Sequence, residues 1–224
     1  VSQGWPGTGS EVDPYVISAL NITYDINAAL IRIFNIESHF VIRDCYVGQL
    51  SNSYAIHLEN VTNAALEFVT IESALEGVSF NNVTNSTVSA IYADASGTDS
   101  VYVGNCHNVE ISDNYLTGGR LYIWKSSGII AHHNEITSTV VQGTRLYESN
   151  GTLFHHNEVT SSGTTGLDIY NSSFCEVYSN RFIDSGGNSI HLRLSENVSI
   201  SDNEIIGASG YGINFESYEW ISIV

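Results

Sequence analysis

The segments LYIWKSSGIIAHHNEI (Leu121–Ile136) and IHLRLSENVSISDNEI (Ile190–Ile205) follow one pattern. Each has two short runs in which apolar and polar residues alternate, and each ends in Asn-Glu-Ile. Alternation with a period of two is typical of β-strands that bury one face. The two segments therefore predict a repeated β unit.

The repeat extends over most of the chain. Similar lines begin at Ile31, Ile56, Val78, Val101, Leu121, Leu146, Leu167, Ile190 and Ile213, in steps of 20 to 25 residues. Three short strands and their turns need about 22 residues, which is one turn of a parallel β-helix. We therefore predict an all-β, single-stranded solenoid of about nine coils over residues 31–224. Residues 1–30 do not match a full coil, and we expect them to cap the first hydrophobic layer.

One coil illustrates the expected side-chain directions. In the coil from Ile190, we expect Ile190 and Leu192 to point inward, and His191 and Arg193 to point outward. A parallel stack places equivalent positions of successive coils about 4.8 Å apart, so each coil covers the core of the next.

Asparagine recurs at one position of five successive coils. The five residues are Asn114, Asn134, Asn157, Asn180 and Asn203. Stacked amides can hydrogen-bond along the stack, and Asn tolerates the left-handed backbone of a tight corner. We therefore predict a structural asparagine ladder.

This pattern resembles the right-handed parallel β-helix repeats of pectate-lyase-like and NosD-type proteins. The segment GTGSEVDPYVI (Gly7–Ile17) looks like the start of such domains in secreted archaeal and bacterial surface proteins. The resemblance covers nearly the whole chain and implies a right-handed β-helix. It implies little about activity, because the same scaffold serves lyases, hydrolases, epimerases, adhesins and envelope proteins.

The charge balance excludes some partners. Seven Lys and Arg residues against 24 Asp and Glu give a net charge of −17, which repels nucleic acids and anionic membrane surfaces. The same balance counts against a polyuronate lyase, whose anionic substrate needs cations at the site. No apolar run approaches the ~18 residues that cross a bilayer, so we expect no membrane span.

Several features favour an exported protein. The chain has no methionine and begins at Val1, from which we expect a removed leader. Cys45, Cys106 and Cys175 form no CxxC motif and read as buried free thiols, with one disulfide as the alternative. Seven sequons permit N-glycosylation, at Asn21, Asn60, Asn82, Asn85, Asn150, Asn171 and Asn197.

The pairs His132–His133 and His155–His156 occupy the same place in neighbouring coils. Four stacked imidazoles, with Glu135 and Glu158 nearby, are candidates for a divalent metal site. The alternative is a solvated, duplicated corner of the repeat. We expect no other cofactor.

Aromatic residues line the outer face of the first strand in four successive coils in the middle of the stack. They are Tyr102, Tyr122, Trp124, Tyr147 and Tyr170. Such a stripe can stack on sugar rings, contact another subunit, or reflect only the preference of aromatic residues for strands.

A catalytic set is less evident. Asp168, His191 and Arg193 would lie on adjacent coils at one end of the stripe, with Glu148 and Glu216 as further carboxylates. The NTD, DD, GHG and RIK series of polygalacturonases does not appear, nor does the calcium cluster of pectate lyases. The sequence therefore does not predict an enzyme.

These features favour an extracellular structural protein of the cell envelope. We predict a self-assembling subunit of a sheath, surface layer or filament, because the whole chain is repetitive and its end, Trp220–Val224, still reads as strand. The alternative is a carbohydrate-binding or carbohydrate-active β-helix that uses the aromatic stripe.

Overall fold

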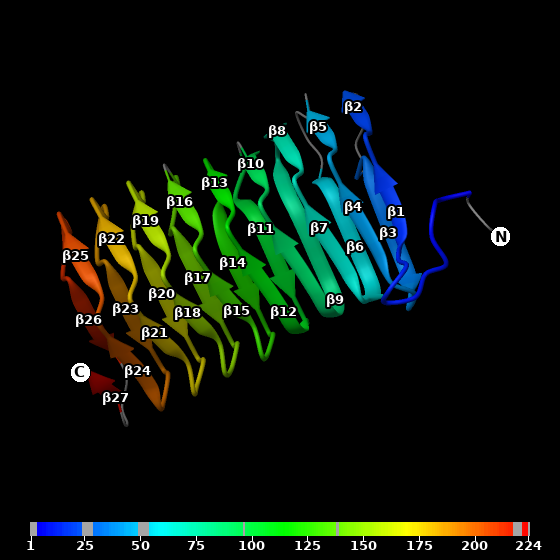
Figure 1. Ribbon diagram of the computed structural model, residues 1–224. Coiled ribbons are helices and arrows are strands. Elements are labelled where there is room, and N and C mark those ends of the chain that lie inside the picture. The colour runs from blue at the N-terminus through cyan, green and yellow to red at the C-terminus, as the bar shows by residue number, and fades with distance from the viewer. Residues whose placement is uncertain are drawn as a thin grey trace.

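The computed structural model describes residues 4–23, 29–48, 54–95, 97–137, 139–216 and 221–223. Within these ranges the chain winds into a parallel β-helix, an elongated stack of coils with the N-terminal coil at one end and the C-terminal coil at the other (Figure 1). The predicted mature N-terminus at Val1 and the chain end at Val224 lie outside the described residues.

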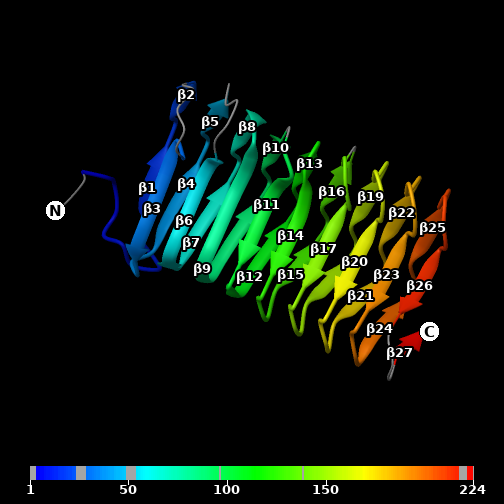
Figure 2. The same ribbon diagram turned by 180° about the vertical axis from the view of Figure 1, so that it is seen from behind.

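Three parallel columns of strands run the length of the molecule, and most coils contribute one strand to each column (Figures 1 and 2). The first two columns are joined through β9 into one 18-stranded sheet, and the third is a nine-stranded sheet; we call the columns the first, second and third sheets. The first sheet contains β3 (Ile31–Ile36), β6 (Tyr54–Thr62), β9 (Glu76–Ser89), β11 (Asp99–Gly104), β14 (Arg120–Trp124), β17 (Thr144–Tyr147), β20 (Leu167–Tyr170), β23 (Ile190–Arg193) and β26 (Ile213–Glu216). The second contains β1 (Tyr15–Ser18), β4 (Phe40–Arg43), β7 (Ala64–Glu67), the end of β9, β12 (His107–Ser112), β15 (Ile130–His132), β18 (Leu153–His155), β21 (Glu176–Tyr178), β24 (Val198–Ser201) and β27 (Ile221–Ile223). The third contains β2 (Asn21–Thr23), β5 (Tyr46–Gly48), β8 (Thr70–Ala74), β10 (Tyr92–Ala95), β13 (Tyr115–Thr117), β16 (Glu135–Thr137), β19 (Glu158–Thr160), β22 (Arg181–Ile183) and β25 (Glu204–Ile206).

The pairing register confirms the predicted repeat, with one correction. Eight of the nine predicted coil starts align in the first sheet, whereas the start predicted at Leu146 is wrong by two residues. Thr144 pairs with Leu121 and Leu167, so Leu146 occupies the second inward position. The apolar-x-apolar pattern missed this strand because its first inward residue is a threonine.

The core follows the predicted alternation. Ile190, Leu192, Val198 and Ile200 are buried, whereas His191 is only half-buried. Burying an aliphatic side chain of this size contributes about 1.5–3 kcal/mol, and every coil repeats the contribution. The stabilisation from the hydrophobic core is therefore distributed along the whole stack of coils.

The predicted asparagine ladder is present at the corner between the second and third sheets. From Asn114 to Asn203, each Nδ2 donates to the Oδ1 of the next asparagine over 2.8 to 3.0 Å. Each of these Oδ1 atoms also accepts the backbone N–H of the preceding asparagine. The left-handed backbone belongs to the residue before each asparagine, such as His133 with φ of 54° and His156 with φ of 53°. The ladder thus completes hydrogen bonding where the strands are interrupted.

A serine column, not predicted from the sequence, does the same at the corner between the first and second sheets. The backbone N–H groups of Ser126, Ser149 and Ser172 each donate to the serine Oγ of the next coil over 2.8 to 3.2 Å. Cys106 occupies the same column and donates its N–H to Ser126 Oγ. Small hydroxyls recur here because they satisfy buried N–H groups within the space of one turn.

The cysteines are buried free thiols, as the first of the two alternatives predicts. Burial raises the pKa of Cys106 to about 12 and that of Cys175 to about 11. Thiols of this kind are protonated at neutral pH and pack as small apolar groups.

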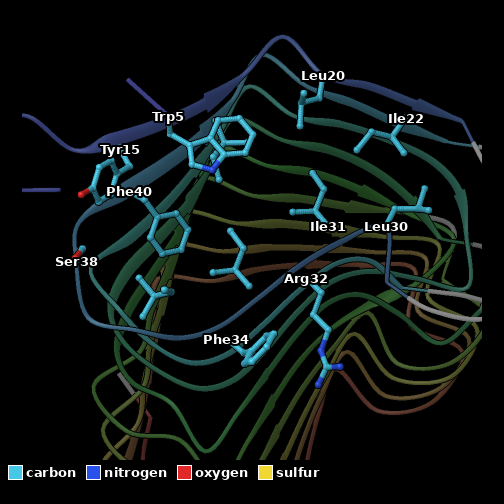
Figure 3. Close-up of a pocket in the computed structure, with 13 residues that line it drawn as sticks. Trp5, Tyr15, Leu20, Ile22, Leu30, Ile31, Arg32, Phe34, Ser38 and Phe40 are labelled. Atoms are coloured by element: carbon cyan, nitrogen blue, oxygen red, sulfur yellow. The ribbon is translucent and has the colours of Figure 1, made fainter. Parts of the chain in front are cut away.

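At the N-terminal end, β1 and β2 continue the second and third sheets over β4 and β5. The predicted cap is thus partly an incomplete coil. In the first sheet, β3 pairs with β6 on one side only among the described strands. Beside it lies a cavity of about 550 Å³, lined mainly by apolar residues including Trp5, Ile31 and Phe40 (Figure 3).

No helix in the described part of the chain is long and apolar enough to cross a membrane.

Asn157→Ala is expected to lower the free energy of unfolding by about 2–4 kcal/mol, because the Asn134 amide and the Ala131 carbonyl both lose buried partners. Chemical denaturation followed by circular dichroism measures the change. The control Asn21→Ala removes an exposed amide and should change it by less than about 0.5 kcal/mol. Equal effects of the two variants would contradict a structural role for the ladder.

Candidate binding face on the first sheet

The outer face of the first sheet carries two columns of side chains. From β9 to β23, the first column contains Ser79, Tyr102, Tyr122, Arg145, Asp168 and His191. The second contains Asn81, Gly104, Trp124, Tyr147, Tyr170 and Arg193. The five predicted aromatic residues therefore share one face. Tyr147 lies in the column of Trp124, and Arg145 takes the place beside Tyr122.

The aromatic rings are half-buried and pack against one another. Tyr147 and Tyr170 stack with ring centroids 4.9 Å apart, and Tyr102 meets Tyr122 edge-on at 5.6 Å. Gly104 makes room for Tyr102, because a Cβ at Gly104 would collide with the tyrosine hydroxyl. The result is a firm surface of ring faces and edges.

Arginine side chains lie between the rings. The guanidinium of Arg145 is 5.0 Å from the Tyr147 centroid and 5.7 Å from that of Tyr122. Arg193 lies 5.0 Å from the Tyr170 ring, and Arg120 lies 4.3 Å from Tyr122. Cations at these distances are attracted to the ring faces.

Asp168 holds two of these arginines. Its side chain is only 1% exposed, and its carboxylate accepts hydrogen bonds of 2.7 and 2.8 Å from Arg193 Nη2. Arg145 Nε lies 3.2 Å from Asp168 Oδ2 but is not aligned for a hydrogen bond. The side chain of Arg145 forms no hydrogen bond with any residue that the structure describes, so its two Nη groups keep donors available to a ligand, whereas its Nε is buried.

A second cluster of charged side chains, formed by Arg120, Asp99 and Glu76, lies on the N-terminal side of the Asp168 cluster. Arg120 donates to Asp99 over 2.6 Å and to Gln142 over 2.9 Å. Burial and the neighbouring Asp99 carboxylate raise the pKa of Glu76 to about 7. Burial raises the pKa of Tyr102 to about 12, so its hydroxyl stays protonated. Glu76 can therefore exchange a proton near neutral pH, and Tyr102 can donate a hydrogen bond.

Charge is distributed unevenly over the molecule. The first sheet, with the residue that follows each strand, carries Arg32, Arg120, Lys125, Arg145 and Arg193 against Glu37, Glu59, Glu76, Asp99, Glu148, Asp168 and Glu216. This face has five cations and seven carboxylates, a balance of −2, out of a total of −17. The rest of the chain therefore carries −15. This face is therefore much less negative than the rest of the chain.

The three residues predicted for catalysis do lie on adjacent rungs, since Asp168 pairs with His191, and Tyr170 with Arg193. Their contacts differ from those of a free acid and base. Asp168 is enclosed by two guanidinium groups, and His191 Nε2 lies 3.2 Å from Glu216. Of the further carboxylates, Glu148 lies 3.6 Å from Lys125.

Sequence reasoning missed Arg145, Arg120, Asp99 and Glu76. The register error at Leu146 removed Arg145 from the outward column, although a constant step of 23 residues to Leu167 would have placed it there. Arg120, Asp99 and Glu76 lie one or two residues before the inward residue at which each predicted coil starts. Their pairing depends on strands beginning earlier than the apolar pattern indicates.

The seven sequon asparagines are all exposed. Some of them have structural partners, since Asn82 donates to Asn60 over 2.8 Å and Asn60 donates to Asn35 over 3.0 Å. Asn60 and Asn82 also have positive φ, so backbone geometry by itself favours asparagine at these two positions.

The histidines stack as predicted. His132 lies 5.1 Å from His155, and His133 lies 5.1 Å from His156, measured between ring centroids. The carboxylate that contacts them is Glu110, rather than the expected Glu135 or Glu158. In the part of the chain that the structure describes, no three His, Cys, Asp or Glu side chains converge on one metal position.

Comparison with known proteins identifies the fold family. The family model described as "Right handed beta helix region" matches residues 29–182 and 119–223. Comparison with curated proteins finds no match.

Several solved structures are similar. They include the A-module of the Azotobacter vinelandii mannuronan C-5 epimerase AlgE4, with 13% identity and a TM-score of 0.56 over 94% of this chain and 79% of that one. A mutant of the periplasmic alginate epimerase AlgG has 15% identity and a TM-score of 0.53 over 84% and 51%. ORF18 of Geobacillus virus E2 has 9% identity and a TM-score of 0.56 over 92% and 54%. This chain spans about half the length of the last two, and at these identities the likeness shows the fold alone.

Glu76 is expected to make the protein less stable as pH rises from 4.5 to about 7. Its pKa is raised from the ordinary value of 4.5, so folding favours the protonated form, and that stability is lost as pH rises between the two values. The loss should be about 2 kcal/mol after allowance for partial exposure. Denaturation curves of wild type and Glu76→Gln at both pH values measure it. Parallel pH dependence in the two proteins would contradict the raised pKa.

Proposed function

Because the chain belongs to the right-handed β-helix family, we propose that it binds a carbohydrate polymer along the outer face of the first sheet. The proposed polymer is a polyuronate, whose sugars carry carboxylates. The observation that carries this proposal is the guanidinium of Arg145. It is held beside Asp168 between two tyrosine rings, and the Arg145 side chain forms no hydrogen bond to any described residue.

The chemistry of the face suits an acidic sugar. Apolar faces of sugar rings pack on aromatic side chains such as Tyr147 and Tyr170. A guanidinium forms two parallel hydrogen bonds with a carboxylate, and it needs little reorganisation when neighbouring rings and carboxylates already hold it. Asp168 orients Arg145 and Arg193 in this way, and it also lowers the cost of burying them.

The elongated shape supports a polymer rather than a single sugar. Two outward positions recur on every rung from β11 (Asp99–Gly104) to β23 (Ile190–Arg193), and each rung places at least one aromatic or charged side chain there. A linear ligand can therefore contact several successive coils. Contacts of this kind add along a chain and give useful affinity even when each one is weak.

The structural neighbours are consistent with the proposal. Two of them are named as epimerases of mannuronan and of alginate, and both have this fold. Their low identity carries no residue roles to this chain. One is named as periplasmic, which accords with our proposal that this protein acts outside the cytoplasm, in the envelope or beyond it.

The proposed function is binding of the polymer, and catalysis is a separate question. Glu76, with its pKa of about 7, and the protonated Tyr102 are groups that could move a proton on a bound sugar. Incubation with a polyuronate, followed by assays for reducing ends, for absorbance of an unsaturated sugar and for epimerisation, would show whether turnover accompanies binding.

Arg145→Gln is expected to weaken binding of oligomannuronate or oligogalacturonate at least tenfold, because the central cation is lost. Isothermal titration calorimetry at low and moderate salt measures the change. The control Arg181→Gln removes a cation from the third sheet and should leave affinity unchanged. Failure of wild type to bind either polymer, or equal binding by both variants, would overturn the proposal.

Self-assembly into a sheath or filament is a second candidate, favoured by the N-terminal end of the solenoid. There, Ile31 and Ile33 of β3 line the apolar cavity. Ile213 and Phe215 of β26 occupy the same register positions at the other end of the first sheet, and Phe215 is 37% exposed. A second copy stacked head to tail would place β26 against β3 and continue the parallel ladder.

Phe34→Arg is expected to shift any oligomer of the protein toward monomer, because it places a charge at the rim of the apolar cavity. Light scattering after gel filtration and electron microscopy measure the shift. Phe174→Arg is the matched control, since Phe174 is 66% exposed and Phe34 is 53% exposed. Monomeric wild type at high concentration would rule out the stacking.

A further inference from the structure

The corner that follows β15 (Ile130–His132) and β18 (Leu153–His155) carries a side-chain arrangement that carbohydrate binding does not use. It lies between the second and third sheets, away from the tyrosines and arginines of the first sheet. On each of these two rungs, a histidine that ends the strand is followed by a histidine with a left-handed backbone. The backbone turn at the second histidine brings the two rings of a pair together.

The Nδ1 atoms of each pair are very close. His132 Nδ1 lies 2.8 Å from His133 Nδ1, and His155 Nδ1 lies 2.9 Å from His156 Nδ1. In the absence of a metal, one ring must donate an N–H to the lone pair of the other. Both pairs have this geometry, which follows from the repeated backbone.

We propose that each Nδ1 pair is a two-nitrogen chelate for a divalent cation of square-planar or tetragonal preference, copper(II) or nickel(II). Metal–nitrogen bonds of about 2.0 Å place two adjacent square-planar ligands about 2.8 Å apart and two tetrahedral ligands about 3.3 Å apart. The observed Nδ1–Nδ1 separations of 2.8 and 2.9 Å match adjacent square-planar ligands. Rotation about the Cβ–Cγ bonds, which is a soft torsion, turns both lone pairs toward one ion.

Glu110 gives the first pair an advantage. Its Oε1 lies 2.9 Å from His132 Nε2, so the carboxylate accepts the Nε2–H and leaves the Nδ1 lone pair free to bind a metal. A carboxylate on the far nitrogen is the usual support of a metal-binding histidine, and its removal commonly lowers metal affinity 10- to 100-fold. The ring of His155 instead stacks on Tyr178 at 4.7 Å. We therefore expect His132–His133 to bind first.

The two pairs act as separate sites. Their rings stack 5.1 Å apart, which is too far for four nitrogens to reach one ion through bonds of about 2.0 Å. Water or a small ligand would complete each coordination sphere, which accords with the absence of a three-residue metal cluster among the described residues. When an ion binds, the proton between the two Nδ1 atoms moves to Nε2 of the ring that carried it, because a neutral imidazole bound through Nδ1 keeps its N–H on the other nitrogen.

The test is a titration of tag-free protein with copper(II) against glycine as a competing ligand, followed by electron paramagnetic resonance. Wild type should bind one equivalent tightly and a second more weakly, with hyperfine splitting from two nitrogens. His133→Asn should abolish the tighter equivalent, and Glu110→Gln should weaken it 10- to 100-fold. Asparagine suits the left-handed backbone of position 133, and circular dichroism verifies folding.

The control is His107→Asn, which removes a histidine of the same sheet that contacts Ser127 rather than another imidazole. It should bind copper as wild type does. The proposal is overturned if wild type binds no stoichiometric copper, if the spectrum shows a single nitrogen, or if His133→Asn and His107→Asn behave alike. Because these readouts involve no sugar, they are independent of the polyuronate proposal.

Discussion

Hydrogen bonds that run along the stack, from one coil to the next, hold the whole molecule together. In the sheets they are backbone ladders, and at two corners side chains replace the missing backbone acceptors. Asn157 Oδ1 accepts the N–H of Asn134, and Ser149 Oγ accepts that of Ser126. Buried N–H groups without partners are costly, and over the coils from Cys106 to Asn203 these side chains supply the missing acceptors at both corners. The need for these acceptors explains why asparagine and serine recur at fixed positions in the sequence repeat.

Hydrogen bonding between coils also determines which side chains become neighbours on the surface. Fixed strand register sets each outward residue directly beside its equivalents on the neighbouring coils. On the first sheet Asp168 therefore lies between Arg145 and the His191 rung, and Asp99 lies against Arg120. Opposite charges in adjacent positions lower the cost of partial burial, while tyrosines fill the places between them. At the histidine corner the same register stacks like residues, His132 on His155 and His133 on His156.

The uneven charge distribution has a functional consequence. A chain with net charge −17 should repel an acidic polymer, yet the first sheet is close to neutral and holds most of the cations. In the proposed complex, the acidic remainder of the surface would limit contacts of such a polymer with the other faces. The guanidinium groups packed among rings on the first sheet would then be the favoured contacts for a polyuronate. The histidine corner, by contrast, offers only two nitrogens per rung and suits a small cation better than a polymer.

The sequence by itself determined the β-helix, its period, the asparagine ladder and the aromatic stripe, because each is a local pattern repeated at nearly constant spacing. It misplaced one strand at Leu146, since Thr144 takes an inward position that the apolar pattern could not reveal. Only the tertiary structure decided which charges meet. Contacts such as Arg145 with Asp168, and Glu76 beside Asp99, join residues more than 20 positions apart, and they depend on register to within one residue. The same holds for the choice of Glu110 over Glu135 as the partner of His132, because side-chain direction at a corner follows from backbone geometry that composition and spacing do not contain.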